Sequence, residues 1–314
     1  NAEKGEVVAA AGKHFLVKPD QEGLITDNLV DCYAGGTIIT PYDNYISVIV
    51  VGDRVYFTRI KNEITDNGLP AGTIVKVEKR RTMLSRKAPG KRNDEHVIAS
   101  NADSLMIIMS TKDPVYNRRL IDRYMIAAEL GELNVAICIN KIDLQAESEF
   151  REDFSVYEKL DIPLFFISAK KNSGLEKVRE YLKDKTTIFS GPSGAGKSTL
   201  LNSLLGEEVQ TVRDISEKTG KGKHTTSLVR MFDFEDTGRI IDTPGIREFG
   251  IYGVEKGELG LYFHDFDEFQ FDCKYLPCTH THEPECAVKD ALEKGLIDPG
   301  RYESYLNIYN SEGG

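Results

Sequence analysis

The first eighty residues alternate short apolar segments with turn residues. Pairs such as Gly35-Gly36 and Asn67-Gly68 supply the turn chemistry. Many short strands with few helical stretches predict a small β-barrel, and we predict an OB-fold, although an SH3-like barrel would give the same pattern. The segments expected to form strands are 5–10, 14–18, 37–40, 47–51, 54–60 and 72–79.

The middle of the chain alternates apolar runs with amphipathic segments. Helical periodicity is clear at 117–130, where Leu120, Tyr124, Ala127 and Ala128 fall on one face. Alternating strands and helices predict a mostly parallel sheet with helices on both faces. The apolar runs expected to form buried strands are 104–109, 135–140, 164–167, 186–189 and 239–241.

The last part of the chain ends in an amphipathic helix whose apolar face carries Tyr302, Tyr305 and Tyr309. The 314 residues suffice for several domains. We predict a multidomain protein with a β-barrel at 1–90, an α/β domain at 91–252 and a small helical domain at 253–314. No apolar run approaches the ~20 residues that span a bilayer, and no secretory signal opens the chain, so we expect a cytoplasmic protein.

Candidate chemistry begins directly after the segment 186–189. The sequence matches the phosphate-binding loop, with a predicted strand before it and a predicted helix at 198–205 after it, which is the context that the motif requires. Its glycines let backbone N–H groups wrap phosphates, Lys197 would reach the β- and γ-phosphates, and the Ser198 hydroxyl would ligate Mg²⁺. The residues expected to contact the nucleotide here are Gly191, Pro192, Ser193, Gly194, Ala195, Gly196, Lys197, Ser198 and Thr199.

Two further motifs follow predicted strands and select the base. In Asn140-Lys141-Ile142-Asp143, the carboxylate of Asp143 can accept hydrogen bonds from N1–H and from the 2-amine of guanine, a group that adenine lacks. Asn140 can bond the base edge and bridge loops, and the Lys141 stem can cover a ring face. Ser168-Ala169-Lys170 would place a backbone N–H on guanine O6. These motifs predict guanine rather than adenine.

The sequence Asp242-Thr243-Pro244-Gly245 ends another predicted strand. Asp242 would hold Mg²⁺ through water, and the Gly245 N–H would sense the γ-phosphate. Upstream, a Gly-rich basic segment ends in Thr225 and Thr226, either of which can be a magnesium ligand. In ordinary small GTPases the base motifs come last, whereas here they precede the phosphate loop. The order predicts a circularly permuted GTPase domain.

The C-terminal region holds a cluster of Cys273, Cys278, His280 and Cys286. An odd total of five cysteines disfavours a disulfide framework. Three thiolates and an imidazole form a closed tetrahedral set, which predicts one structural Zn²⁺. His282 is a competing ligand, and free thiols are the alternative.

A formal net charge of −10 would repel nucleic acid if the charge were evenly spread. The segment 76–92 is an exception, because it holds eight basic residues and Glu78 as its one acid. Taken alone, such a run is more typical of a solvated linker than of a binding surface.

The chain resembles the ribosome small-subunit-dependent GTPase A family, circularly permuted GTPases that assist late maturation of the small ribosomal subunit. The resemblance covers nearly the whole chain, including Val51-Gly52-Asp53, the permuted motif order, the segment 220–226 and the spacing of the Cys/His cluster. It implies an OB-fold, a GTPase domain and a zinc domain in which the four clustered residues are ligands and His282 is not. It also implies that the basic segment faces RNA, with contacts from Lys79, Arg80, Arg81, Arg86 and Lys87.

One position is chemically unusual. Ras-like enzymes carry a water-orienting Gln after this motif, but Ile246 stands there in this chain and cannot orient water. His224 is our candidate to do so, and contact of His224 with RNA or solvent is the alternative. We therefore predict a monomeric GTP hydrolase that uses Mg²⁺ and is stimulated by the small ribosomal subunit and its rRNA, away from membranes. The rival functions are a nucleotide-dependent RNA-binding protein with little turnover and a P-loop ATPase.

Overall fold

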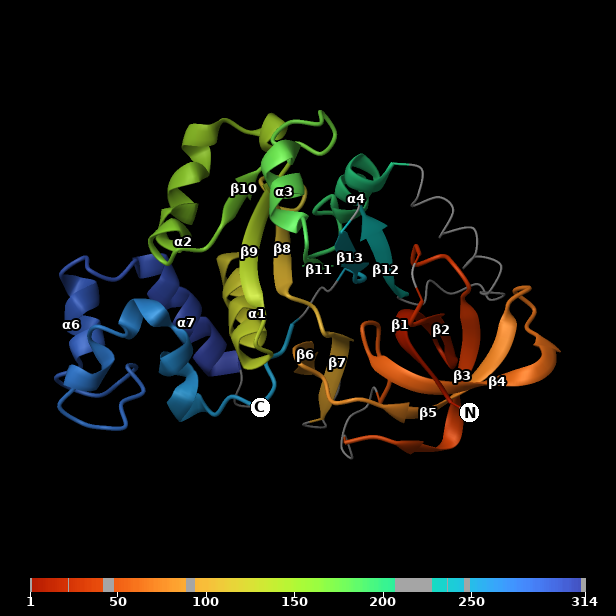
Figure 1. The fold of residues 1–314 in the computed structure, drawn as a ribbon. Helices are drawn as coiled ribbons and strands as arrows, with labels where there is room; N and C mark the ends of the chain where they lie inside the picture. The colour runs from red at the N-terminus through yellow and green to blue at the C-terminus, as the bar shows by residue number, and fades with distance from the viewer. Residues whose placement is uncertain are drawn as a thin grey trace.

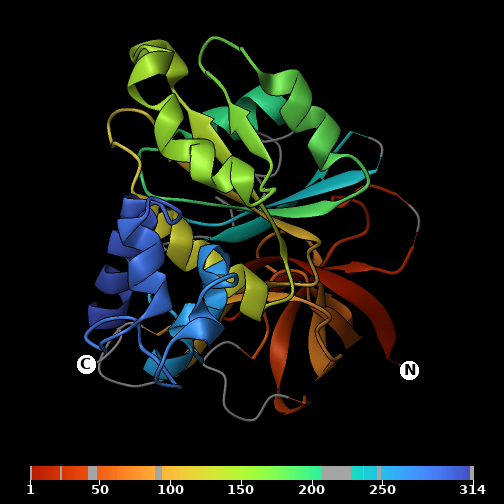
Figure 2. The same ribbon diagram turned by 90° about the vertical axis from the view of Figure 1, so that its left-hand side faces the viewer.

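The N-terminal part of the protein is a closed β-barrel (Figures 1 and 2). The computed structural model describes residues 2–21, 23–41, 48–88, 94–206, 228–235, 237–245 and 249–311. The barrel order β1-β2-β3-β5-β4 closes through a second pairing of β1 with β4. Because β3 and β5 pair in parallel, the barrel differs from an all-antiparallel SH3-like one, and the predicted OB-type barrel is confirmed. Its strands are β1 (Glu3–Ala11), β2 (His14–Pro19), β3 (Val30–Ile39), β4 (Arg54–Ile64) and β5 (Pro70–Val77).

Two local predictions within the barrel were wrong. The segment 37–40 is only the end of β3, and the Gly35-Gly36 pair lies inside this strand rather than in a turn. A Cβ added to Gly35 would lie 2.9 Å from the backbone oxygen of Ile74 on β5, so glycine here permits close approach of two strands. The segment 47–51 forms no strand over its described residues 48–51, where Val51 makes an isolated bridge to Ala99.

Over its described residues 76–88, the basic segment is an ordered element rather than a linker. It contains β6 (Met83–Lys87), which pairs with β7 (Glu95–Ser100) in a separate two-stranded sheet. Arg80, just before β6, is buried and donates two hydrogen bonds to the carboxylate of Asp53. A guanidinium committed to a buried carboxylate is not available to an RNA phosphate, so the prediction of Arg80 as an RNA contact was wrong.

The α/β part contains a parallel sheet in the order β10-β9-β8-β11-β13. At its edge, β12 runs antiparallel to β13 and continues the sheet into β1 of the barrel. The strands predicted from apolar runs are all present, and β12 is an addition to them. The strands are β8 (Ser104–Ser110), β9 (Asn134–Asn140), β10 (Leu164–Phe166), β11 (Thr186–Ser190), β12 (Val229–Phe234) and β13 (Gly238–Asp242).

Helices cover both faces of this sheet, as predicted. Successive residues of β8 point to opposite faces: Ile107 belongs to the core shared with α1 (Arg118–Leu130), and Ile108 belongs to the core shared with α3 (Leu175–Leu182) and α4 (Lys197–Leu205). Burial on both faces explains why the strand is apolar without alternation. Short helices complete the layer: η1 (Ile142–Leu144), η2 (Glu147–Glu149), η3 (Arg151–Phe154) and α2 (Ser155–Lys159).

The C-terminal region packs against α1, where α7 lies beside that helix (Figure 1). Ile126 of α1 shares an apolar cluster with Phe263 and Tyr305. The buried guanidinium of Arg301 on α7 pairs with Asp122 of α1. Over the described residues, we find no helix with the length and apolar character needed to cross a membrane. The helices of this region are η4 (Lys256–Tyr262), η5 (His264–Phe266), η6 (Gln270–Asp272), α6 (Ala287–Glu293) and α7 (Pro299–Ser311).

Candidate functional site

The predicted nucleotide motifs meet at one edge of the parallel sheet. They follow the carboxyl ends of β9, β10, β11 and β13, and these ends lie together because the strands are parallel. Crevices at this edge are the usual place for ligands in open α/β sheets. Motifs that are far apart in the chain therefore converge despite their permuted order.

The phosphate loop runs from β11 directly into the first turn of α4. Ser193, Gly194, Ser198 and Thr199 are exposed, whereas Ala195 is buried. The backbone of Gly196 has a φ of +89°, and an added Cβ would lie 2.3 Å from the Asn140 side-chain nitrogen. Only glycine fits this position, and its absent side chain lets two nucleotide motifs touch. Pro192 and Gly191 complete the turn out of the strand.

Asn140 holds three loops together through its side-chain amide. Its Nδ2 donates to the backbone oxygen of Ala195 in the phosphate loop at 3.1 Å. Its Oδ1 accepts from the backbone N–H of Ala169 at 3.0 Å and of Lys141 at 2.8 Å. Asn140 is almost fully buried, so these bonds are shielded from water. One side chain thus joins the phosphate loop and both base motifs. The sequence predicted that Asn140 bridges loops but did not indicate which ones.

The carboxylate of Asp143 is poised as an acceptor. A hydrogen bond from Ser168 is the largest influence on its pKa and lowers it, and Lys171 and Lys170 add weaker effects in the same direction. The Lys171 ammonium lies 3.8 Å from the carboxylate. A lowered pKa keeps Asp143 ionised at neutral pH, the state in which it accepts hydrogen bonds and donates none.

Lys141 is supported by the loop after β8, which sequence reasoning missed. The backbone oxygen of Lys141 accepts from the Thr111 hydroxyl at 2.8 Å, and the Lys141 Nζ donates to the backbone oxygen of Lys112 at 3.2 Å. Thr111 is fully buried. The left-handed backbone of Lys141, with φ 63°, is held by these contacts. The only sequence signal was the position of Thr111 two residues after the predicted strand 104–109.

The Asp242–Gly245 segment lies against the phosphate loop. The Lys197 ammonium is 3.9 Å from the Asp242 carboxylate. Burial lowers the pKa of Lys197, and the Asp242 charge opposes this effect. A Cβ added to Gly245 would lie 3.0 Å from the backbone nitrogen of Ser193, which shows how closely the two motifs approach. The predicted residues His224, Thr225, Thr226 and Ile246 lie outside the described residues.

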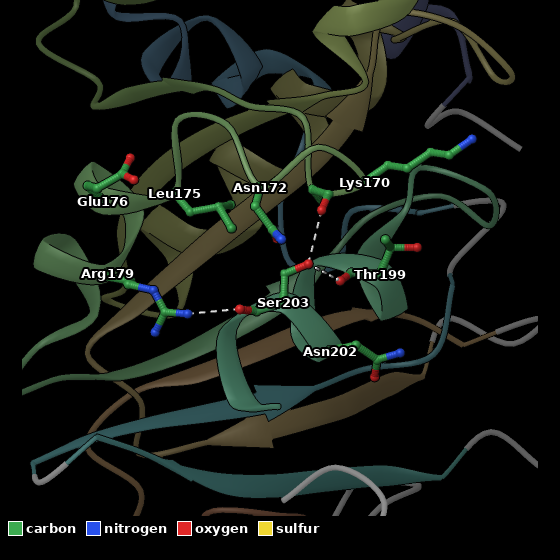
Figure 3. Close-up of a pocket in the computed structure, with 9 residues that line it drawn as sticks. Lys170, Asn172, Leu175, Glu176, Arg179, Thr199, Asn202 and Ser203 are labelled. Carbon is green, nitrogen blue, oxygen red and sulfur yellow. Dashed lines mark hydrogen bonds between the residues drawn. The ribbon is translucent and has the colours of Figure 1, made fainter. Parts of the chain in front are cut away.

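A pocket of about 650 Å³ borders these motifs, between α3 and α4 (Figure 3). Lys170 and Thr199 are among the residues that line it. The Ser203 hydroxyl donates to the backbone oxygen of Ala169 at 3.0 Å. Arg179 donates to the Ser203 backbone oxygen at 2.8 Å and so caps the carboxyl end of α4. Sequence reasoning missed Arg179, because no local motif marks an arginine that caps a distant helix.

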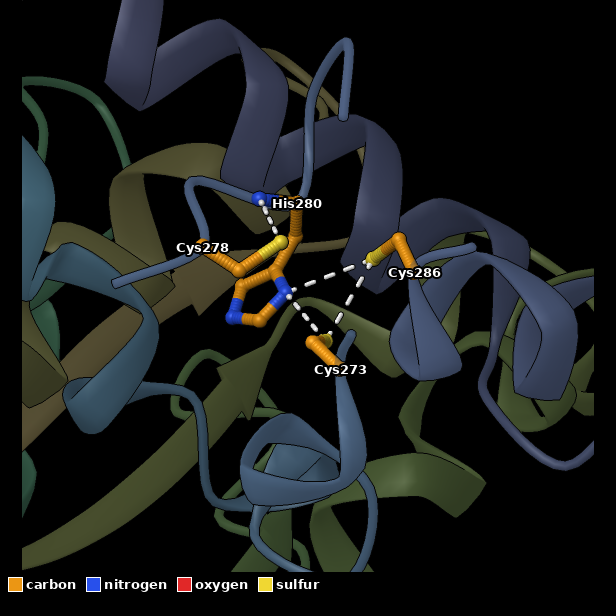
Figure 4. Close-up of side chains that lie close together, drawn as sticks. All are labelled: Cys273, Cys278, His280 and Cys286. Atoms are coloured by element: carbon orange, nitrogen blue, oxygen red, sulfur yellow. Dashed lines mark hydrogen bonds between the residues drawn. The ribbon is translucent and has the colours of Figure 1, made fainter. Parts of the chain in front are cut away.

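The Cys/His cluster has the geometry of a tetrahedral metal site (Figure 4). The four ligand atoms of Cys273, Cys278, His280 and Cys286 lie within 4.8 Å of one another, and all four residues are buried. The Cys273 and Cys286 sulfurs are 3.8 Å apart, and the His280 Nδ1 lies 3.6 and 3.4 Å from them. A regular zinc tetrahedron requires about 3.8 Å between sulfurs and about 3.5 Å between sulfur and nitrogen. The donor set of four residues and the spacing of these three atoms therefore fit Zn²⁺.

His282 lies apart from this cluster. It is exposed, and its Nδ1 is 3.0 Å from the Thr281 hydroxyl. The loop that carries His280 is held by α7: the backbone oxygen of His280 accepts a hydrogen bond from the Tyr302 hydroxyl at 2.6 Å. Tyr305 of the same helix donates to the backbone oxygen of Thr279 at 2.6 Å. The tyrosine face of α7 thus holds the loop that carries His280.

Comparison with known proteins agrees with this arrangement. A family model described as RsgA GTPase matches residues 77–252, which is more than half of the 314 residues. The small ribosomal subunit biogenesis GTPase RsgA of Chlorobaculum parvum is 44% identical over 269 residues, covering 84% of this chain and 86% of the relative. RsgA 2 of Bacteroides thetaiotaomicron, of the same description, is 36% identical over 309 residues, covering 97% and 96%.

Solved structures extend the likeness to the whole fold. YjeQ from Thermotoga maritima is 29% identical, with a TM-score of 0.71 over 100% of this chain and 99% of its own. YloQ, described as a circularly permuted GTPase, is 25% identical, with a TM-score of 0.68 over 99% of this chain and 95% of its own. The barrel, the permuted α/β sheet and the C-terminal cluster all fall within these matches. This chain belongs to the RsgA GTPase family.

Proposed function

We propose that this GTPase assists maturation of the small ribosomal subunit, and that the subunit stimulates its conversion of GTP to GDP and phosphate. The observation that carries the nucleotide part is the bridging of three motif loops by Asn140. The ribosomal part is supported by relatives whose names describe small ribosomal subunit biogenesis. We also propose that the protein is a monomer and that it acts in the cytoplasm.

Guanine recognition is assigned to Asp143 and the Ser168–Lys170 motif. The ionised Asp143 accepts from guanine N1–H and the 2-amine. Ser168 N–H already donates to the backbone oxygen of Ser173 at 3.0 Å, and Ala169 N–H donates to Asn140. We therefore assign the contact with guanine O6 to the backbone N–H of Lys170. The Lys141 stem lies over the base.

The phosphate and metal side of the site uses the loop from Gly191 to Thr199. Its backbone N–H groups and Lys197 bind the phosphates. The exposed Ser198 hydroxyl and the Asp242 carboxylate are hard oxygen donors, the kind that Mg²⁺ takes together with phosphate oxygens and water. Thr225 or Thr226 supplies the further ligand of the switch. Bound Mg²⁺ would neutralise charge that develops on the transferred phosphoryl group.

We assign the positioning of the attacking water to His224, because the aliphatic side chain of Ile246 has no group that can orient it. His224→Ala should keep GTP affinity and lose most of the stimulated turnover. The loss should fall on kcat more than on KM, as for an interaction realised in the transition state. Unchanged stimulated hydrolysis in this variant would exclude His224 from the mechanism.

We assign the interface with ribosomal RNA to the basic segment 76–92, and we exclude Arg80 from it because Arg80 is buried against Asp53. Lys79 and Arg81 are exposed, and Arg86 and Lys87 on β6 are half-buried. Phosphate contacts release counterions, so binding that depends on these residues should weaken as salt rises.

Multiple-turnover hydrolysis with and without purified small subunits tests the whole proposal. The expected result is GTP turnover well above the intrinsic rate when subunits are present, and no comparable turnover of ATP. Binding without stimulation would favour an RNA-binding protein that holds nucleotide only as a ligand. Equal turnover of ATP would favour the P-loop ATPase alternative.

A pelleting assay locates the interface. Binding to subunits should occur with a non-hydrolysable GTP analogue, weaken with GDP, and be lost when Lys79, Arg81 and Lys87 are changed to Gln. The matched control changes the exposed Lys159, Lys177 and Lys183, which lie at α2 and α3, to Gln. Equal losses in both triple variants would show that net charge, rather than the basic segment, governs binding.

A further inference from the structure

A chain of buried hydroxyl groups lies beneath the nucleotide loops. Ser190 is the last residue of β11 before the phosphate loop, and Thr243 directly follows Asp242. The Ser190 Oγ lies 3.1 Å from the Thr243 Oγ1 and 3.0 Å from the Tyr124 hydroxyl on α1. The backbone oxygen of Phe189, 2.9 Å from the Thr243 Oγ1, is a second acceptor for the one proton of this hydroxyl. The chain therefore joins α1 to the ends of two neighbouring strands.

Burial makes these contacts sensitive to the loss of any one member. Tyr124, Ser190 and Thr243 have no measurable exposure to solvent. Burial raises the pKa of Tyr124 to about 12, against the opposing hydrogen bond from Ser190, so the phenol stays neutral at physiological pH. Each hydroxyl can both donate and accept, and removal of one leaves its neighbour without a partner where water does not reach.

The same part of α1 also holds the chain beyond Gly245. The ring of Phe249 packs 4.4 Å from the ring of Tyr124, measured between centroids. The backbone oxygen of Phe249 accepts from the Arg123 Nη1 at 2.9 Å. Tyr124, through Ser190, and its neighbour Arg123 thus hold Thr243 and Phe249, which lie on either side of Gly245 in the sequence.

We propose that Tyr124 is a positioning residue for GTP hydrolysis. Through Ser190 its hydroxyl sets the start of the phosphate loop, and through Thr243 it sets the Asp242–Gly245 segment. Its ring fixes Phe249 on the other side. Tyr124 itself touches no nucleotide, and it acts by holding the magnesium-side segment in register with the phosphate loop.

Helix α1 links this position to the C-terminal region. Asp122 and Arg123, the two residues before Tyr124, bond to Arg301 and Ser311 of α7. A displacement of the segment at Gly245 therefore acts on the helix against which α7 packs. The inference goes beyond the roles assigned above, and it depends on the GTPase activity but not on the ribosomal partner.

The test compares Tyr124→Phe with the unaltered protein in the absence of subunits. This variant keeps the ring against Phe249 and removes only the hydroxyl. We expect kcat for GTP to fall about fivefold, from the loss of one buried hydrogen bond, while GDP affinity and KM change less than about twofold. Thr243→Val should lower kcat about as much as Tyr124→Phe does. Thr243→Ser, which keeps a hydroxyl at this position, should retain turnover. The Tyr124→Phe, Thr243→Val double variant should lose little more than either single variant, because the hydroxyls act as a unit.

Thr187→Val is the matched control. Thr187 lies on the same strand as Ser190, is fully buried, and has its hydroxyl 2.9 Å from that of Ser104, away from the nucleotide edge. It should lower thermal stability as Thr243→Val does but leave kcat unchanged. The proposal is overturned if Tyr124→Phe keeps its full kcat, if Thr187→Val loses as much kcat, or if the losses of the double variant simply add.

Discussion

The guanidinium of Arg80 and the carboxylate of Asp53 form a two-bonded pair, with Nε to Oδ1 at 2.8 Å and Nη2 to Oδ2 at 2.9 Å. Their side chains are 2% and 0% exposed. Asp53 also accepts from the backbone N–H of Val50 at 2.8 Å and from the Ser100 hydroxyl at 2.6 Å. One buried carboxylate thus ties the barrel to the start of the basic segment and to β7.

Arg80→Met should destabilise the protein strongly, because it leaves the Asp53 charge buried with no cationic partner. The expected cost is about 3–5 kcal/mol in the free energy of unfolding. Arg81→Met is the control, since the Arg81 side chain is 60% exposed and pairs with Asp103 at the surface. That change should cost less than about 1 kcal/mol. Urea unfolding measures both, and equal midpoints would contradict a structural role for Arg80.

Asp143→Asn should change the base that the protein prefers. An amide can donate to the 2-oxo group of xanthine, whereas the carboxylate accepts from the 2-amine of guanine. Calorimetry should show weaker GDP binding and a gain for xanthosine diphosphate. Lys171→Gln, which removes the neighbouring charge but keeps the carboxylate, should retain the preference for guanine. The unaltered protein should bind ADP far more weakly than GDP, and equal affinities would contradict guanine recognition at this site.

His280→Ala should abolish zinc retention, and His282→Ala should not. The first removes a buried member of the four-residue cluster, and the second removes an exposed histidine outside it. Metal analysis of the intact protein should find about one zinc per chain. Cys278→Ser or a chelator should loosen the C-terminal region and leave GDP binding largely intact. Loss of zinc in His282→Ala would overturn the assignment of the ligands.

The contacts of His264 between α1 and the C-terminal region predict that the stability of the protein depends weakly on pH. Its Nε2 is 3.0 Å from Glu129 of α1, and its Nδ1 is 2.9 Å from Asp267. Burial lowers the pKa of His264, but the hydrogen bonds and charges of Asp267 and Glu129 outweigh it, so the pKa is raised. A raised pKa in the folded state stabilises the fold below the unfolded value of about 6.5, and the gain is lost as pH rises through the folded pKa.

The effect of His264 should stay below about 1 kcal/mol, because the side chain is half exposed and screened. Thermal unfolding of the zinc-loaded protein between pH 6 and 8 measures it. His264→Gln should reduce this pH dependence. A pH profile that does not respond to His264→Gln would exclude this pair.

The parallel sheet was predictable because its strands are buried on both faces and read as continuous apolar runs. The barrel strands were harder to predict. The Gly35-Gly36 pair is typical of a turn, yet Gly35 lies inside β3, where the close approach of the Ile74 backbone requires a glycine. β6 was hidden by its charge: Leu84 is buried, but the basic residues after it are typical of a linker.

The nucleotide motifs were predictable because each is a short local sequence. The residues that hold these motifs in place were not predictable, because their contacts join residues that are distant in the chain. Tyr124 was expected only as part of an apolar helix face, and nothing near it in sequence indicates the hydroxyl of Ser190. Arg80 was misread for the same reason, since its partner Asp53 lies in another element.

The place of β11 in the sheet has a consequence for the growing chain. This strand pairs with β8 on one side and β13 on the other, although β8, β9 and β10 are synthesised before it. Until β11 emerges, β8 has an unpaired edge and apolar faces, the kind of edge that recruits other chains. The strand that fills this gap is the one that carries the phosphate loop. In the nascent protein, the pairing of the β8 edge and the phosphate loop therefore arrive with the same strand.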